Sequence, residues 1–172
     1  FALISKKYKD WKLVFAGNGE INQARKLAKD LLIFDQVEFT GWITGNKKNE
    51  IFSKSTIFCL PSNAEGFPMS ILEALSYSLP VLSTKCGGID LVLTNEKNIL
   101  FFEIGDFKQL SIGLEKLITD NKFRNMLRKN GNLFSRKNFE LEKVVDKIKI
   151  IYKKIKNYGK NTSHWGCWND WF

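Results

Sequence analysis

The chain has 172 residues, a length that corresponds to about one domain. Hydrophobic residues make up 44% and charged residues 26%, which is close to average usage and excludes a chain that is disordered throughout. The formal net charge is +9. No apolar run approaches the roughly 18 residues that would span a bilayer, and no secretory leader opens the sequence, although that second observation has weight only if the natural N-terminus is present.

The hydrophobic pattern predicts strands that alternate with helices. In chain order it indicates strand 12–16, helix 20–32, strand 37–40, helix 47–53, strand 56–60, a helix that begins at Pro68, strands 81–83 and 100–102, and helices 107–118, 121–137 and 141–157. Such alternation is typical of right-handed βαβ units. We therefore expect an α/β fold with a parallel sheet covered by helices on both faces, ending in two or three helices.

Several loop residues share one edge of the predicted sheet. Gly17, Trp42, residues 62–65 and the turn at Gly87-Gly88 all follow predicted strands. Ligands of open α/β sheets bind outside the carboxyl ends of the strands. One pocket at this rim could therefore collect these residues.

The run PSNAEGFPMSILEALSYSLPVLSTKCGG is the most informative part of the chain. Pro68 is expected at the first helical position, because its φ angle is already helical and its missing N–H would have no partner there. Glu65 would then lie just ahead of the helix and Glu73 one to two turns inside it. The free amides of Met69 and Ser70, at the positive end of the helix dipole, would point to the same place as Glu65. This arrangement predicts a pocket for an anion flanked by hydroxyl groups.

Each of these features also has an ordinary interpretation. Glu65 could be a loop charge and Glu73 a carboxylate on a helix surface, and a carboxylate pair is also what glycoside hydrolases use. Gly17-Asn18-Gly19 lacks the third glycine of the dinucleotide fingerprint and could be a tight turn. Trp42 could be a packed side chain.

Five groups of residues fall in order at the intervals of a known signature. They are Pro61-Ser62, Glu65-Gly66-Phe67, Leu72-Glu73-Ala74-Leu75, Leu79-Pro80-Val81 and Gly87-Gly88. This segment resembles glycosyltransferase family 4, a group of retaining, nucleotide-sugar-dependent enzymes with the two-domain GT-B fold. The looser similarity of residues 13–19, 37–42 and 98–101 and of Asp106 extends the resemblance over residues 1–150.

The resemblance implies the C-terminal, donor-binding half of such an enzyme, with a Rossmann-like sheet. Residues 1–158 would form this nucleotide-sugar-binding domain, and residues 159–172 an aromatic tail. The acceptor domain and a basic motif that grips the donor diphosphate would precede Phe1, so we expect a fragment with little activity by itself. The implied reaction moves a hexosyl unit from a nucleoside-diphosphate sugar to an acceptor hydroxyl with retention, in surface polysaccharide or glycolipid synthesis, with no cofactor and no obligatory metal.

The resemblance also implies roles for particular residues. Glu73 would accept two ribose hydroxyls. Glu65, the expected catalytic residue, would lie next to the transferred sugar and hold a ring hydroxyl with help from backbone amides. Trp42 would lie beside the nucleotide base. The full set of expected donor-binding residues is Gly17, Asn18, Gly19, Trp42, Ile43, Glu65, Gly66, Phe67, Pro68, Met69, Ser70 and Glu73.

The positive charge is concentrated near the C-terminus. Residues 121–160 contain 13 Lys or Arg against 3 Asp or Glu, whereas the remaining residues contain 14 against 15. Apolar residues recur at helical intervals in 141–158 with lysines between them, which predicts an amphipathic helix whose apolar stripe packs on the domain. The alternative is attraction to an anionic membrane surface. We expect no nucleic-acid binding, because no such motif accompanies the charge.

Three cysteines, Cys59, Cys86 and Cys167, are widely spaced and odd in number. This argues against a disulfide framework and favours reduced thiols in the cytoplasm. The basic C-terminal helix adds the alternative that the enzyme lies at the inner face of the membrane. His164 and Cys167 are too few ligands for a metal site. A second class of function also remains, namely a non-catalytic nucleotide-sugar-binding module that docks on an anionic membrane or a partner.

Overall fold

The computed structural model describes residues 1–161, with side chains described as far as residue 156. It divides into two compact units, residues 1–133 and the residues from 134 onward. The aromatic side chains of the predicted tail, together with His164 and Cys167, lie outside the described residues. The predicted domain boundary at residue 158 stays a prediction.

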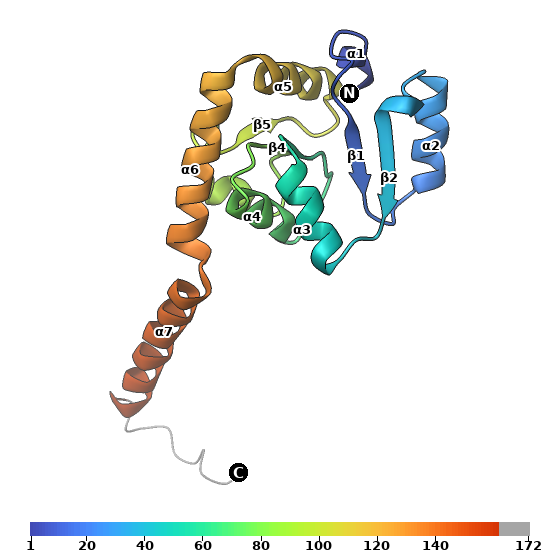
Figure 1. The fold of residues 1–172 in the computed structure, drawn as a ribbon. Helices are drawn as coiled ribbons and strands as arrows, with labels where there is room; N and C mark the ends of the chain where they lie inside the picture. The colour runs from blue at the N-terminus through green and yellow to red at the C-terminus, as the bar shows by residue number, and fades with distance from the viewer. Residues whose placement is uncertain (162–172) are drawn as a thin grey trace. The chain divides into compact units, whose positions relative to one another are not determined.

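The first unit alternates strands and helices, as the sequence predicts (Figure 1). Its elements are α1 (Ala2–Ser5), β1 (Leu13–Ala16), α2 (Ile21–Asp30), η1 (Phe34–Gln36), β2 (Val37–Gly41), α3 (Gly45–Lys54), β3 (Phe58–Leu60), α4 (Met69–Ser76), β4 (Val81–Thr84), η2 (Ile89–Leu91), β5 (Leu100–Phe102), α5 (Phe107–Thr119) and most of α6 (Asn121–Phe139). Asp106 begins α5 as its N-cap, where its carboxylate accepts hydrogen bonds from the amides of Lys108 and Gln109.

All strand pairs are parallel, which confirms the predicted α/β class. The hydrogen bonds, however, form two sheets, β1–β2 and β3–β4–β5, where the sequence suggested one. In the described residues β1 pairs only with β2, and β3 pairs only with β4. The periodicity of a sequence locates strands but carries no information on which strands become neighbours, so this division was not predictable.

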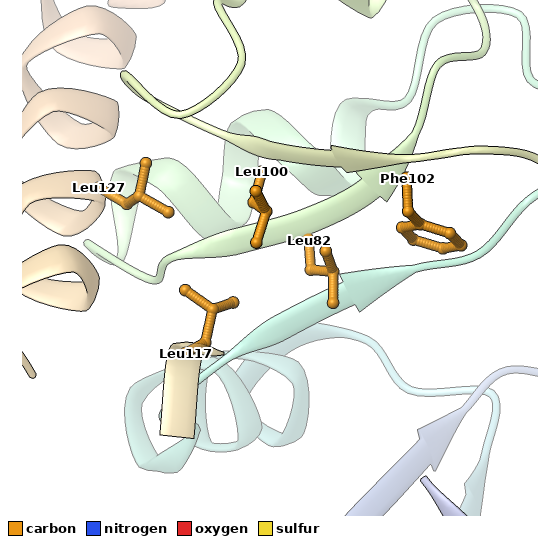
Figure 2. Packing of buried hydrophobic residues seen from close by; sticks show 5 residues of the cluster. All are labelled: Leu82, Leu100, Phe102, Leu117 and Leu127. Carbon is orange, nitrogen blue, oxygen red and sulfur yellow. The ribbon is translucent and has the colours of Figure 1, made fainter. Parts of the chain in front are cut away.

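The main core lies between the three-stranded sheet and the helices that follow it. Figure 2 shows its buried cluster, which consists of Leu82, Leu100, Phe102, Leu117 and Leu127. Leu82 and Leu100 are register partners, so their side chains share one face of the sheet, and α5 and α6 cover that face. All four residues of β4 are buried, as expected for a strand covered on both sides.

The two-stranded sheet is less completely covered. Val14 and Phe15 of β1 are 37% and 38% exposed. On α2, Ala28 is buried while Leu27 is 58% exposed, so only part of the apolar face of this helix is covered.

Helix α6 holds the C-terminal end of α4 in place. The Asn132 side-chain amide donates to the carbonyl oxygens of Leu75 and Ser76 at the end of α4, where the last carbonyl groups lack a full set of helical partners. A Cβ atom on Gly131 would lie 2.5 Å from Leu75 Cδ2, so only glycine allows this close approach. These contacts orient α4, which begins at the rim of the sheet.

The second unit contains the end of α6 and the long helix α7 (Leu141–Asn161). The rings of Phe134 and Phe139 lie 5.9 Å apart between centroids. Along α7 the side chains of Leu141, Val145, Ile148, Ile151 and Ile155 are exposed. No helix in the described part of the chain is long and apolar enough to cross a membrane.

Candidate functional site

The predicted rim residues lie where the sequence placed them. Gly17 follows β1, Trp42 follows β2, residues 62–65 follow β3, and Gly87-Gly88 come after β4. Since all strands are parallel within their sheets, these loops are at the carboxyl ends. The structure joins them in two groups, one on each sheet.

The first group is held by hydrogen bonds between the loops after β1 and β2. The Gly17 amide donates to the Gly41 carbonyl at 2.9 Å, and the side-chain oxygen of Asn18 accepts from the Trp42 amide at 2.8 Å. The Trp42 side chain is 71% exposed, so the structure does not support its interpretation as an ordinary packed residue. Gly19 lies in the turn before α2, where its carbonyl accepts from the Ile21 amide.

The second group is built around Glu65. The Ser62 hydroxyl donates to Glu65 Oε1 at 2.6 Å, and the Thr84 hydroxyl donates to the Ser62 carbonyl at 2.6 Å. The loop after β3 is therefore fastened to the end of β4, and this contact holds the Glu65 carboxylate in place.

Gly87 lies directly against the Glu65 loop. Its φ of +65° is in the left-handed region, and a Cβ atom there would lie 2.9 Å from the Gly66 carbonyl oxygen and 3.0 Å from both Glu65 Cβ and Pro68 Cδ. Only glycine satisfies both conditions. The signature residues of the two loops are thus close together because the loops pack backbone against backbone.

Helix α4 begins one residue later than the sequence predicted. Pro68 precedes the first helical residue, Met69, and has a non-helical ψ of 87°. Its carbonyl accepts the first bond of the helix, from the Ile71 amide at 3.0 Å. The prediction of Pro68 at the first helical position was therefore wrong by one residue, because the proline ring restricts φ but leaves ψ free. The consequence drawn from it is unchanged, since the amides of Met69 and Ser70 still lie in the first turn.

Glu73 forms an ion pair that the sequence did not reveal. Lys48 Nζ on α3 lies 2.7 Å from Glu73 Oε1 on α4, and the two side chains are 34% and 40% exposed. The residues are 25 positions apart in the chain. The sequences of the two helices do not indicate that α3 and α4 lie close together. Only the tertiary structure identifies this lysine.

The other predicted site residues differ in accessibility, with Pro68 buried and Ser70 half-buried. Gly66, Phe67 and Met69 are exposed, while Ile43 is half-buried between β2 and α3. In the described residues no hydrogen bond or ion pair joins the Asn18–Trp42 group directly to the Glu65 group. Helix α3 connects them, because it follows the Trp42 loop and its Lys48 pairs with Glu73 on α4, the helix that follows the Glu65 loop. The rim is thus an open surface.

Two hollows on the surface lie elsewhere. One is lined by Ser78, Asn125, Arg128, Lys129, Asn132 and Leu133. The other is lined by Phe15, Glu20, Gln23, Ala24, Lys26, Leu27 and Asp30. Neither includes Glu65 or Glu73. The lining of the first has no carboxylate that could accept a hydroxyl group, and the second includes Glu20, the N-cap of α2, whose negative charge would repel an anion there, so the rim remains the better candidate.

The described cysteines offer no activated thiol. Cys59 and Cys86 are both free, and Cys86 is buried next to the Thr84 hydroxyl. Burial raises the pKa of the Cys59 thiol to about 12, so its reactive thiolate form is scarce at neutral pH.

Comparison with known proteins gives a consistent assignment. The sequence model of the family described as glycosyl transferases group 1 matches residues 1–134. An uncharacterized glycosyltransferase of Haemophilus influenzae is 30% identical over 151 residues, and a UDP-Gal:alpha-D-GlcNAc-diphosphoundecaprenol alpha-1,3-galactosyltransferase of Escherichia coli is 32% identical over 145 residues. The alignments cover 87% and 83% of this chain, but 42% and 37% of those proteins. The chain thus spans less than half the length of these relatives.

The fold also resembles the solved structure of a C-terminal domain. The C-terminal domain of a glycosyl transferase group 1 family protein from Francisella tularensis superposes with a TM-score of 0.74 at 24% identity. The match covers 81% of this chain and 75% of that domain.

Proposed function

The chain belongs to the glycosyl transferases group 1 family, and we propose that it is the donor-binding part of a retaining hexosyltransferase. The reaction is transfer of a hexosyl unit from a nucleoside-diphosphate sugar to an acceptor hydroxyl. The observation that carries this proposal is the arrangement of Glu65, the first turn of α4 and Glu73 on one exposed rim.

The first turn of α4 provides the diphosphate site. Met69 and Ser70 have amides without an intrahelical acceptor, and the helix dipole is positive at this end. Such helix ends bind phosphate groups. Gly66 leaves room for the ligand, since nothing lies within 4 Å of where its Cβ would be.

The two glutamates bind the sugars on either side of the diphosphate. Glu73 lies in the second turn of α4, where its carboxylate accepts the two hydroxyls of the ribose. Glu65 precedes the helix and accepts a ring hydroxyl of the transferred hexose, and the hydrogen bond from Ser62 orients it. Trp42 presents an exposed aromatic face on which the base stacks.

The chemistry follows from the developing charge. As the bond from the anomeric carbon to the diphosphate breaks, negative charge grows on the leaving group, and the α4 amides stabilise it. The acceptor hydroxyl attacks from the same face and passes its proton to the leaving phosphate, which retains the anomeric configuration. Glu65 positions the hexose in this scheme and forms no covalent intermediate, and the scheme uses no metal ion.

Further parts of the enzyme are needed for turnover. An acceptor domain would close over the open rim and add the basic residues that hold the diphosphate, so the 172-residue chain by itself would have little activity. The name of the Escherichia coli relative includes a diphosphoundecaprenol-linked substrate. We propose surface polysaccharide or glycolipid synthesis in the cytoplasm as the setting of this chain.

Helix α7 suits contact with an anionic membrane. The exposed side chains of Leu141, Val145, Ile148, Ile151 and Ile155 recur at three- and four-residue intervals and so form one stripe, and Ile150 is exposed on the opposite side. By helical geometry, lysines flank that stripe on both edges: Lys143, Lys147 and Lys154 on one, Lys149, Lys153 and Lys156 on the other. Amphipathic helices that lie in a membrane interface have this pattern.

A non-catalytic nucleotide-sugar-binding module is the second candidate, and the same α7 surface supports it. Such a module would need the nucleotide site but not Glu65. The two candidates therefore differ in what Glu65 does. With the chain joined to its acceptor domain, an enzyme loses sugar transfer on Glu65→Gln, whereas a binding module shows no transfer in either form.

Titration with UDP, GDP and ADP tests the nucleotide site itself. At least one of these nucleotides should bind the wild-type chain. Glu73→Ala should lower the affinity for that nucleotide by about tenfold or more, since a charge-assisted hydrogen bond contributes about 1.5 to 3 kcal/mol. Glu50→Ala is the control, because Glu50 pairs with Lys54 on α3 and should not affect binding. Absence of binding by all three nucleotides, or equal binding by Glu73→Ala, would refute the proposal.

A further inference from the structure

We propose that Lys48 is a positioning residue for Glu73, and that this pair makes the site select ribonucleotides over 2′-deoxyribonucleotides. The inference rests on the proposed function, because it assigns to Glu73 the ribose of the donor. It adds a residue that belongs to none of the signature groups.

The ion pair connects two parts of the rim. Lys48 lies in the first turns of α3, the helix that follows the Trp42 loop, and Glu73 lies in α4, which follows the Glu65 loop. Their charged groups are 2.7 Å apart, and both side chains are partly shielded. By contrast, the Lys54–Glu50 pair on α3 joins residues within one helix, and its side chains are 74% and 59% exposed. The Lys48–Glu73 pair is therefore a tertiary contact and not a local surface pair.

Lys48 restrains the carboxylate without consuming it. An ionised carboxylate offers about four acceptor sites on its two oxygens. Lys48 occupies one of them, on Oε1, so Oε2 and the second site of Oε1 remain for two neighbouring hydroxyls. A glutamate that is already held in one orientation loses less side-chain entropy when the ribose binds.

The charge of Lys48 has a second effect. An unpaired Glu73 carboxylate would repel the diphosphate of the same ligand. With Lys48 at 2.7 Å the pair is neutral overall, so the site can present a carboxylate to the ribose while it binds an anion at the start of α4.

The effect of this positioning can be measured as the ratio of the affinities for a ribonucleotide and its 2′-deoxy counterpart. A carboxylate fixed by Lys48 makes its bond to the 2′-hydroxyl with good geometry, and that bond is lost with a 2′-deoxynucleotide. A carboxylate without Lys48 samples several rotamers and gains less from that hydroxyl. Removal of Lys48 should therefore reduce the preference for ribose. A change that only loosened the fold would instead lower the affinities for both nucleotides by the same factor.

The test is a calorimetric titration of the full 172-residue chain with UDP, GDP and ADP and with their 2′-deoxy counterparts. The variants are Lys48→Met, which keeps the length of the side chain, Lys48→Gln, which keeps a donor without the charge, Lys48→Arg, and Glu73→Ala. Lys54→Met is the matched control on the same helix. Circular dichroism verifies the fold of each variant, and Lys48→Gln replaces Lys48→Met if the latter does not fold.

We expect the wild-type chain to prefer the ribonucleotide by about tenfold and Glu73→Ala to show almost no preference, as the loss of one charge-assisted hydrogen bond requires. Lys48→Met should bind the ribonucleotide about fivefold more weakly and have a clearly smaller preference, Lys48→Arg should recover much of both, and Lys54→Met should match the wild type. If Glu73→Ala loses the preference but Lys48→Met keeps it in full, the role of Lys48 is refuted and the proposed function stands. If the wild-type chain binds no nucleotide, both are refuted.

Discussion

The side-chain oxygen of Asn18 accepts a hydrogen bond from the backbone amide of Trp42 at 2.8 Å, although the residues belong to loops that follow different strands. A glycine-rich turn and an aromatic loop that are separate features in the sequence are therefore one structural unit. The hydrogen bond to Asn18 restrains the backbone of Trp42 and thereby the position of its exposed ring.

Asn18→Ala should release the Trp42 loop. The Trp42 amide should then exchange with solvent about 3- to 10-fold faster, which corresponds to the loss of one ordinary hydrogen bond, and nucleotide affinity should fall by a similar factor. Amide hydrogen exchange and titration measure the two effects. Asn22→Ala on α2 is the control, and equal exchange rates in the two variants would show that the Asn18 bond is not formed in solution.

Gly87→Ala should destabilise the protein by about 2 to 5 kcal/mol, the sum of a left-handed backbone penalty and a steric clash with the Glu65 loop. Gly105 is the matched control. It has a similar φ of +77°, but nothing lies within 4 Å of an added Cβ, so Gly105→Ala should cost only about 1 to 2 kcal/mol. Urea denaturation measures both, and equal losses would contradict the close contact between the two loops.

Sequence reasoning located the elements well and their tertiary relations poorly. The strand at residues 100–102 and the helix starts at 107, 121 and 141 were predicted as observed, because hydrophobic periodicity is a local signal. The order of rim residues along the chain was also sufficient to place them at strand ends. The roles implied for Glu65 and Glu73 stay predictions, which the nucleotide titrations test.

The features that the sequence could not provide depend on contacts between distant segments. In the sequence nothing distinguishes Lys48 from other helix lysines. Its pairing with Glu73 is evident only from the contact between α3 and α4. Leu32, Ser78 and Glu96 have positive φ angles although none is glycine, so no local residue type marks these turns. In each case the surrounding tertiary structure determines the conformation.

The contact between the segment that follows α1 and helix α5 should make stability depend on pH. Hydrogen bonds from Lys7, at 2.5 Å, and from the Tyr8 hydroxyl, at 2.8 Å, lower the pKa of the Glu115 carboxyl. A carboxyl whose pKa is lower in the folded state stabilises the protein above its unfolded pKa, and this stabilisation is lost as the pH falls through the folded pKa. Glu115→Gln should therefore lower the urea midpoint at pH 7, and the difference from wild type should vanish in acid.

The comparison of the two midpoints at pH 7 and near pH 3 measures this effect. Glu38→Gln is the control, because no basic partner for Glu38 is found among the described residues. A difference for Glu115→Gln that is as large in acid as at neutral pH would show that the ion pair is not its source.

Helix α7 should bind vesicles through one face only. Ile148→Asp places a charge in the apolar stripe and should abolish cosedimentation with vesicles of phosphatidylcholine and phosphatidylglycerol. Ile150→Asp introduces the same charge two residues away, on the opposite side of the helix, and should bind almost as the unchanged chain does. Binding that is equal for the two variants, or equal on vesicles of phosphatidylcholine alone, would argue against the membrane contact.

Amide chemical-shift mapping by NMR with the best-binding of UDP, GDP and ADP tests the central claim most directly. A donor site at the rim predicts that the largest shifts fall on Trp42, Gly66 and Met69, in the loops after β2 and β3 and at the start of α4. Shifts that cluster instead around Arg128 on α6, or no shifts at all, would contradict the account.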